Sequence, residues 1–200
     1  MAKQYDEISE RWAEFIRTQK IFFVATASQD GRINISPKGL DSLRILGPNR
    51  VAWLNLTGSG NESAAHILHS PRMTLMFCAF SGDPVILRLY GQARAIHQKD
   101  PDWPEMFGLF PALPGSRQIF DVAIDLVQTS CGFGVPYYDF AGDRPDLADW
   151  THKKGEAGVK RYWRERNAQS LDGIETGIAD KNVCEEAPPI VTTDPQEGGG

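Results

Sequence analysis

Residues 53–80 read WLNLTGSGNESAAHILHSPRMTLMFCAF and combine two strand patterns with a turn and a short helix pattern. The flanking runs WLNL and RMTLMFCAF are rich in apolar and aromatic residues, which favours two buried strands. The glycines of TGSG favour a tight turn before a helix that begins near Asn61. Pro71 ends that helix, because proline cannot continue one. The stretch therefore predicts a strand, a turn, a stubby helix and a second strand.

Upstream of this stretch, short apolar runs alternate with turn residues. IFFVATA (residues 21–27) and INIS (residues 33–36) flank an Asp30-Gly31 pair, which is a strong hairpin signal. LRILGPNRVAWLNL (residues 43–56) predicts a second hairpin with Gly-Pro-Asn as its turn. Before both hairpins, residues 5–20 carry apolar side chains at helical spacing and predict an amphipathic helix.

Downstream, two long strand patterns are followed by a helical one. VILRLYGQARAIH (residues 85–97) predicts a long strand with a bulge at Gly91, and QIFDVAIDLVQTS (residues 118–130) predicts the last strand. Residues 144–169 have a helical composition, although two internal glycines weaken the middle of that helix.

Six or seven strands joined mostly by hairpins indicate a mainly β (α+β) protein. The expected architecture is an antiparallel β-barrel flanked by helices. Residues 1–181 are predicted to form one domain that includes the N-terminal helix and the C-terminal helical region. Residues 182–200, NVCEEAPPIVTTDPQEGGG, lack periodicity and are predicted to form a flexible tail.

The composition excludes several classes of protein. A length of 200 residues suits one domain, and a formal net charge of −5 argues against a general nucleic-acid binder. The first residues are too charged for a secretory signal and no apolar run reaches membrane-spanning length, so we expect a soluble cytoplasmic protein. Three scattered cysteines without a CxxC pair predict neither a disulfide framework nor a zinc site.

The glycine-containing turn is compatible with three interpretations. Gly58, Gly60 and Ser63 occupy the spacing of a dinucleotide fingerprint, and Asp83 lies where a ribose ligand would be. Against that interpretation, the third glycine is missing and the strands are joined by hairpins, whereas a Rossmann half needs crossover helices. The second interpretation is an ordinary helix start with Asn61 as N-cap.

The third interpretation is an anion site. Free N–H groups at the start of a helix attract anions, and the hydroxyls of Thr57 and Ser59 add donors. In NISPKG (residues 34–39), proline and glycine end a strand and leave Lys38 one hairpin away from this turn. A lone lysine is most often solvated, but this position allows Lys38 to face the same phosphate.

In this arrangement the chain resembles the pyridoxamine 5′-phosphate oxidase-like superfamily of FMN-binding split barrels. The resemblance covers roughly residues 21–130, and it rests on SPKGLDS, TGSGNESAAH and SCGFGVP in the order of hairpins and strands described above. It implies a split barrel that forms a homodimer, with FMN at the dimer interface. It also implies a flavin-dependent oxidoreductase that acts on a small molecule by hydride transfer at flavin N5.

The resemblance also assigns roles by position. Ser36 and Lys38 match the strand that meets flavin or phosphate, and Asn55 and Thr57 match the strand that faces the ring edge and ribityl chain. Ser59 and Asn61 match the helix start that takes the phosphate, while Arg117 and Gln118 match a region that reaches the site from the partner subunit.

Substrate identity does not carry over from the resemblance. The turn TGSGN lacks the basic cluster of true pyridoxamine phosphate oxidases, and RYWRERNAQSLDG does not match their C-terminal substrate motif. No catalytic acid or base is assigned, because a flavin supplies its own redox chemistry. The alternative is a non-catalytic protein that binds flavin, deazaflavin or haem on the same barrel.

Other residues have two readings each. SCGFGVPYY (residues 130–138) is either a packed barrel rim or an aromatic lip over the flavin, and Cys131 is a candidate redox thiol. His66 and His69 have the spacing of a ligand pair, but no metal site is predicted, because the helix adds no further ligand except Glu62. The basic, aromatic segment within residues 152–167 is expected to contribute to the dimer interface rather than to bind nucleic acid.

Overall fold

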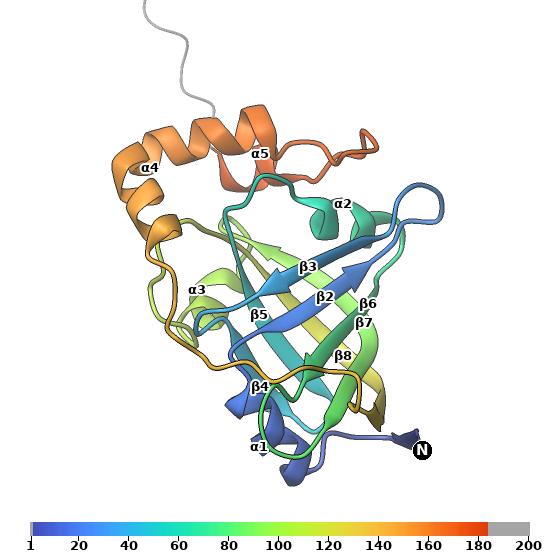
Figure 1. Cartoon of the computed structure of the whole chain (residues 1–200). Helices are drawn as coiled ribbons and strands as arrows, with labels where there is room; N and C mark the ends of the chain where they lie inside the picture. Colours follow the sequence, from blue (N-terminus) through green and yellow to red (C-terminus); the bar gives the residue numbers. More distant parts are fainter. Residues whose placement is uncertain (1, 184–200) are drawn as a thin grey trace, which may run out of the picture.

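A computed structural model describes residues 2–183 and shows one antiparallel sheet with helices at its ends (Figure 1). The described residues form eight strands, in the spatial order β3-β2-β6-β7-β8-β5-β4, with β1 paired to β8. The strands are β1 (Lys3–Tyr5), β2 (Phe22–Thr26), β3 (Asn34–Lys38), β4 (Leu43–Gly47), β5 (Arg50–Leu56), β6 (Arg72–Cys78), β7 (Val85–His97) and β8 (Ser116–Cys131).

All pairings between these strands are antiparallel, which confirms the predicted fold class and excludes the Rossmann alternative. The predicted number of six or seven strands becomes eight because Lys3–Tyr5 pairs with β8. The register between β7 and β8 shifts at Gly91, as predicted. Glycine is required there, because a Cβ atom at this position would lie 2.0 Å from the carbonyl oxygen of Ala123.

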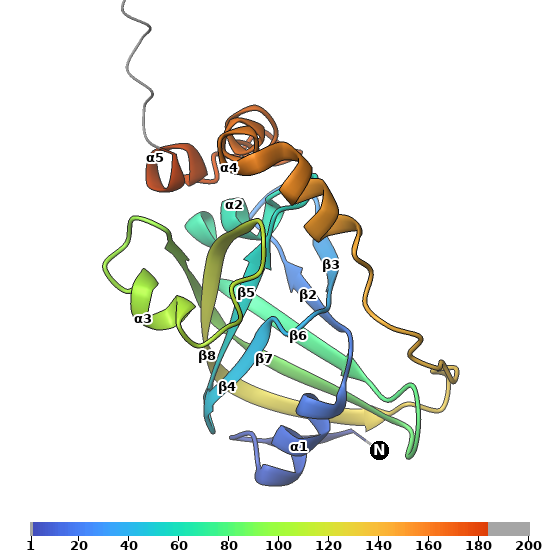
Figure 2. The same ribbon diagram turned by 90° about the vertical axis from the view of Figure 1, so that its left-hand side faces the viewer.

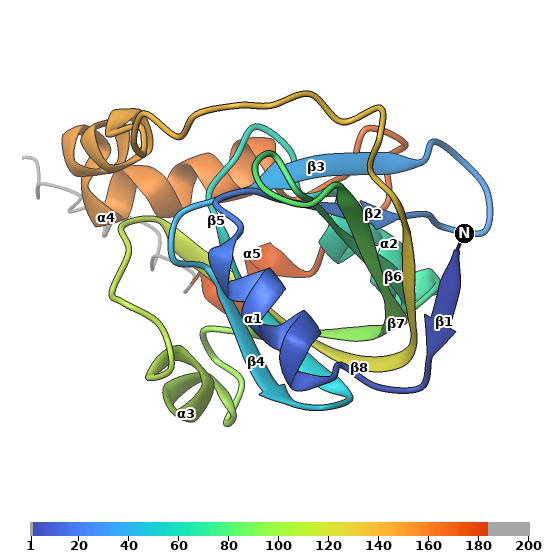
Figure 3. The ribbon, with the colours of Figure 1, turned by 60° about the horizontal axis from the view of Figure 1, so that its bottom comes forward.

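The sheet curls into an open barrel (Figure 3). Its two ends are β3 and β4, and within residues 2–183 no ladder joins β3 to β4 or β5. The barrel interior is apolar, and its centre contains Trp53 and Phe120, which stack with ring centroids 4.4 Å apart. The opening between β3 and β5 therefore lies beside a rigid, tightly packed core.

The helices occupy both ends of the barrel (Figures 1 and 2). They are α1 (Glu10–Thr18), α2 (Glu62–His69), α3 (Trp103–Phe107), α4 (Asp146–Arg166) and α5 (Ile178–Asn182). At one end, Trp12 and Ile16 of α1 pack into the core, whereas α2, α4 and α5 lie at the opposite end. Among the described residues no helix is long and apolar enough to cross a membrane.

Two predicted helical boundaries differ from the structure. The helix expected over residues 5–20 begins only at Glu10, because the chain before it pairs with β8. The helix α4 is broken at Gly155, whose φ of 67° is left-handed, as its glycines suggested. Asn182, assigned to the tail from the sequence, is the last residue of α5 and is buried, whereas residues 184–200 lie outside the described part.

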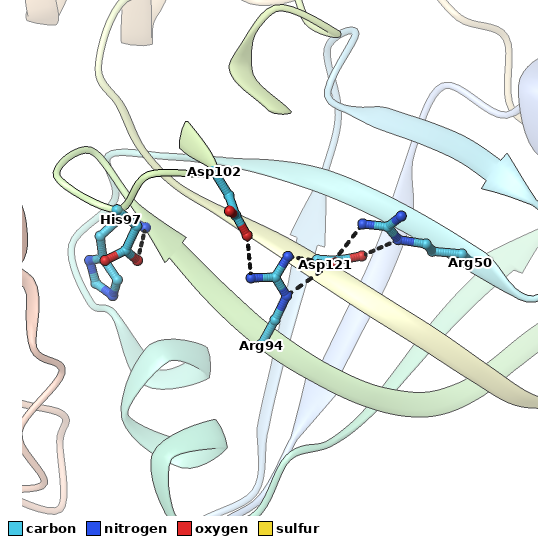
Figure 4. A network of polar contacts seen from close by, with 6 residues as sticks. Arg50, Arg94, His97, Asp102 and Asp121 are labelled. Atoms are coloured by element: carbon cyan, nitrogen blue, oxygen red, sulfur yellow. Dashed lines mark hydrogen bonds and ion pairs between the residues drawn. The ribbon is translucent and has the colours of Figure 1, made fainter. Parts of the chain in front are cut away.

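An ion network crosses three neighbouring strands on the side of the barrel near α3 (Figure 4). The buried carboxylate of Asp121 accepts hydrogen bonds from Arg50 Nε at 2.8 Å and from Arg94 Nε at 3.0 Å. Arg94 also donates to Asp102 at 2.8 Å. Burial opposes ionisation of Asp121, but hydrogen bonds and charge from the two arginines outweigh it and hold the pKa of the carboxyl below its ordinary value.

Replacing Asp121 by asparagine should lower the free energy of unfolding by about 1–3 kcal/mol near pH 7, because hydrogen bonds to a charged partner are lost. The folded carboxyl has a pKa below its unfolded value of about 3.9. Its contribution is therefore complete above that value and disappears as the pH falls through the folded pKa. Urea denaturation of both proteins at neutral and acid pH measures this difference.

Asp125→Asn is the matched control, because Asp125 is exposed on the same strand and its side chain makes no ion pair within the described residues. An equal loss of stability in both variants, or a difference between them that does not shrink as the pH falls into the acid range, would contradict a specific role for Asp121.

Candidate functional site

A cavity of about 890 Å³ opens where the barrel is split, between β3 and the end of β5. Its other walls are the turn after β5, the start of α2 and the segment after α4. Seven of the eight site residues predicted from the sequence line it, namely Ser36, Lys38, Asn55, Thr57, Ser59, Asn61 and Arg117. The eighth, Gln118, is fully buried and lies behind the cavity, with its amide 3.1 Å from the amide of Asn55.

The turn between β5 and α2 presents unpaired donors. Within residues 2–183, no backbone N–H group from Gly58 to Ser63 has a hydrogen-bond acceptor. Asn61 stands at the N-cap position of α2, but its side chain makes no capping hydrogen bond. Asn61 is therefore the N-cap residue by position, as one interpretation predicted, but its side chain leaves the N–H groups of the first turn unsatisfied, so these groups and the helix dipole remain available to an anion.

The side chain of Asn61 provides a second observation of the same kind. It is 2% exposed and lines the cavity, yet its Nδ2 atom has no partner within the described residues. A buried amide without a hydrogen bond costs free energy, so its position points to a ligand that supplies the missing partner.

Arg117 brings a positive charge to the floor of the cavity while only 3% exposed. Its Nη1 donates to Asn167 Oδ1 at 2.6 Å, and its Nη2 donates to the carbonyl of Gly60 at 2.9 Å. When the side-chain amide of Asn55 is oriented with its oxygen toward Arg117, Nε of Arg117 donates to that oxygen at 3.2 Å. Within residues 2–183 no carboxylate forms an ion pair with this guanidinium.

Burial lowers the pKa of Arg117 to about 9, opposed by the nearby Tyr162, so the group is still a cation at neutral pH. Lys38 lies at the end of β3 with its ammonium 5.1 Å from the ring centroid of Trp53. Burial and then the charge of Arg117 lower the pKa of Lys38 to about 8. Two cations thus face one cavity, and in the absence of an anion each disfavours the charged form of the other.

Two carboxylates also line the cavity, but one of them is already engaged. Both oxygens of Glu62 lie 3.1 Å from the backbone nitrogen of Leu171, from which the carboxylate accepts a hydrogen bond. Glu165 is exposed on the last turn of α4. Neither residue pairs with Lys38 or Arg117 within the described chain, so the positive charge at the floor is not neutralised.

The sequence did not predict that residues 163–176, which we call the C-terminal arm, close one side of the cavity. Trp163 Nε1 donates to Thr57 Oγ1 at 2.8 Å, and Asn167 Nδ2 donates to the carbonyl of Gly58 at 3.0 Å. The hydroxyl of Thr57 in turn donates to the carbonyl of Gly115 at 2.8 Å. Thr57 therefore borders the cavity, but its hydroxyl hydrogen serves the fold, unlike that of the exposed Ser59.

The remaining candidates lie outside this cavity. Phe133, Tyr137 and Tyr138 are exposed and do not line it, so they form no lip over the cavity of their own chain. His66 is buried, with Nδ1 3.1 Å from Thr26 Oγ1, and within residues 2–183 no cluster of three acidic, histidine or cysteine side chains could hold a metal ion. Cys131 is exposed at the end of β8 and forms no disulfide with the other described cysteine.

Fold and site together define an open β-barrel protein with a cavity at the point where a strand is followed by a helix whose first N–H groups have no acceptor among the described residues. The chain belongs to the pyridoxamine 5′-phosphate oxidase family, whose sequence profile matches residues 8–131. The protein ustO of Aspergillus flavus, described as a pyridoxamine 5′-phosphate oxidase family protein, is 35% identical over 199 residues. That match covers 88% of this chain and 80% of its relative.

A solved structure agrees with the fold. An inferred pyridoxamine 5′-phosphate oxidase from Lactobacillus delbrueckii superposes with a TM-score of 0.50 at 19% identity, covering 62% of this chain and 94% of that one. A pyridoxamine 5′-phosphate oxidase-related, FMN-binding protein from Nostoc punctiforme gives a TM-score of 0.44 at 14% identity, over 58% of this chain and 76% of that one. A similarity as low as the second supports no argument about this chain.

Proposed function

We propose that this protein binds FMN in the cavity and acts as a flavin-dependent oxidoreductase on a small molecule. The observation that carries the proposal is the unneutralised cation Arg117 beside a turn whose N–H groups lack acceptors. A phosphate monoester complements both the cation and the free N–H groups, because it carries roughly two negative charges and three acceptor oxygens in one place. Family membership supports a flavin as the rest of the ligand.

The chain's own residues fit such a ligand in distinct ways. Backbone N–H groups of residues 58–63, the Ser59 hydroxyl and the Asn61 amide would hold the phosphate, with Lys38 and Arg117 supplying charge. The leucines that line the cavity offer apolar contact to a flat ring. When bound, FMN supplies hydride transfer at its N5 atom, so the protein needs to bind, orient and exclude water rather than provide a nucleophile.

A haem-binding protein on the same barrel is the alternative, and the donor set of the cavity favours flavin. Haem iron is held by histidine, cysteine, methionine or tyrosine. None of these residue types occurs among the described residues that line the cavity. A non-catalytic flavin carrier uses the same contacts as an enzyme, so the two are separated by kinetics. An enzyme accelerates reoxidation of the reduced flavin by its acceptor beyond the rate of free FMN.

We also propose that a second copy of the chain covers the exposed face of β3. Ile35 of this edge strand is 66% exposed, and Ile33, which directly precedes the strand, is 74% exposed. The segment of residues 132–145, which carries four exposed aromatic side chains, runs along the same side of the molecule in all three ribbon views (Figures 1, 2 and 3). An open sheet edge with exposed apolar residues is a site for association.

Replacing both Ile33 and Ile35 by aspartate should convert the proposed dimer into monomers, because like charges would face each other across the interface. Sedimentation equilibrium measures the change. Aspartate at the exposed Leu171, which lies outside this face, is the control and should leave the dimer intact. A wild-type protein that sediments as a monomer would contradict the proposal.

Lys38→Ala combined with Asn61→Ala should weaken FMN binding about 10- to 100-fold, since a charged contact and a buried amide contact are both lost. Quenching of flavin fluorescence measures the affinity, and circular dichroism checks the fold. Lys153→Ala removes the same charge from an exposed position of α4 outside the cavity and should leave the affinity unchanged. Unchanged affinity in the double variant would refute the phosphate assignment.

Affinity for FMN should fall as the pH rises from about 7 to about 9, because Lys38, with a pKa of about 8, then loses its proton in the free protein. The phosphate is already doubly ionised over this range, since its second pKa is about 6. Titrations of the wild type and of Lys38→Met at several pH values measure the slope. A slope equally steep in Lys38→Met would show that another group is responsible.

A further inference from the structure

Asn167 lies in the C-terminal arm, beyond the part of the chain that the family profile matches. It is fully buried, at the C-cap of α4. Its side-chain oxygen accepts from Arg117 Nη1 at 2.6 Å, and its Nδ2 donates to the carbonyl of Gly58 at 3.0 Å. Its own backbone is held by Trp163 and Thr176. One side chain thus connects the buried cation with the turn that presents the free N–H groups.

We propose that Asn167 is a positioning residue that makes the site selective for a phosphorylated ligand over its unphosphorylated counterpart. This inference rests on the proposed function and deepens it. Asn167 acts through Arg117 and through the turn, and it does not touch the ligand itself. Two independent effects support the role, one of geometry and one of charge.

The first effect concerns the direction of the N–H groups. In a planar trans peptide, the C=O of one residue and the N–H of the next point in opposite directions. Asn167 fixes the carbonyl of Gly58, so the N–H of Ser59 points away from the arm. Arg117 fixes the carbonyl of Gly60 in the same manner, so the N–H of Asn61 also points away from it. Asn167 and Arg117 together therefore direct the two carbonyls toward themselves. The N–H groups of Ser59 and Asn61 consequently point the other way.

The second effect concerns charge. An amide oxygen satisfies a guanidinium without cancelling its charge, whereas a carboxylate at the same position would form an ion pair. Asn55 and Gly60 also supply neutral oxygens, so every described hydrogen-bond partner of Arg117 is uncharged. The positive potential of the buried guanidinium is thereby preserved for the ligand's phosphate.

The arm is attached to the rim of the cavity at two more points. Asp172 forms an ion pair with Arg32 of the β2–β3 hairpin, and Glu62 accepts from the nitrogen of Leu171. These two contacts hold the segment after Asn167 against the β2–β3 hairpin and the start of α2. The position of Asn167 is consequently determined by tertiary contacts and not by the helix alone.

The decisive experiment compares FMN with riboflavin, which differ only by the phosphate. In Asn167→Asp, the ratio of the riboflavin Kd to the FMN Kd should fall at least tenfold, while the riboflavin Kd itself changes less than twofold. Flavin fluorescence titration gives both constants. A merely structural role would weaken both ligands together. Gln92→Glu, an equal change of charge at an exposed position of β7 outside the cavity, should leave the ratio unchanged.

Each outcome has one meaning. A wild-type protein that binds both flavins equally contradicts the phosphate site of the proposed function. A wild type that discriminates, together with a folded Asn167→Asp variant of the same ratio, overturns the role of Asn167 alone. If the aspartate variant does not fold, Asn167→Ala takes its place with the same expected loss of selectivity, because Arg117 and the Gly58 carbonyl are both released.

Discussion

Arg117 carries a positive charge into the interior, where water is lost and each N–H group needs an acceptor. Its partners come from three separate parts of the chain, namely Asn55 on β5, Gly60 in the following turn and Asn167 in the C-terminal arm. All of them are neutral, so the site stays positive. The orientation of the Gly60 carbonyl and the attachment of the arm through Asn167 both depend on this one guanidinium.

The open barrel explains why such a site can exist in a small protein. A fully closed sheet would fill its interior with side chains, but here β3 lies at the free end of the sheet and leaves a gap beside β5. The stacked rings of Trp53 and Phe120 make the neighbouring core rigid, and the ammonium group of Lys38 lies over the ring of Trp53. Rigid walls keep donors in place without a ligand, which reduces the entropic cost of binding.

Residues 8–131 give the family's barrel, whereas the arm comes from the region after it. The turn TGSGN contains no basic side chain, so the positive charge at the cavity comes from Lys38 and Arg117. The orientation of the turn is fixed by Asn167. Under the function that we propose, this division would separate the general ability to hold a flavin from selectivity for its phosphate. The arm that borders the cavity lies wholly outside residues 8–131, the part of the chain that the family profile matches.

The sequence by itself determined the antiparallel barrel and the bulge at Gly91, because turns, periodicity and strand ends are local properties of the chain. Most of the residues around the cavity were assigned through the resemblance to a known family. The sequence missed β1, whose three residues form a strand only through pairing with β8. It also missed Trp163 and Asn167, which meet the turn across sequence separations of 106 and 109 residues. Only the tertiary structure decided those contacts, since a buried polar side chain has no periodic signature and acquires its role from the groups it meets.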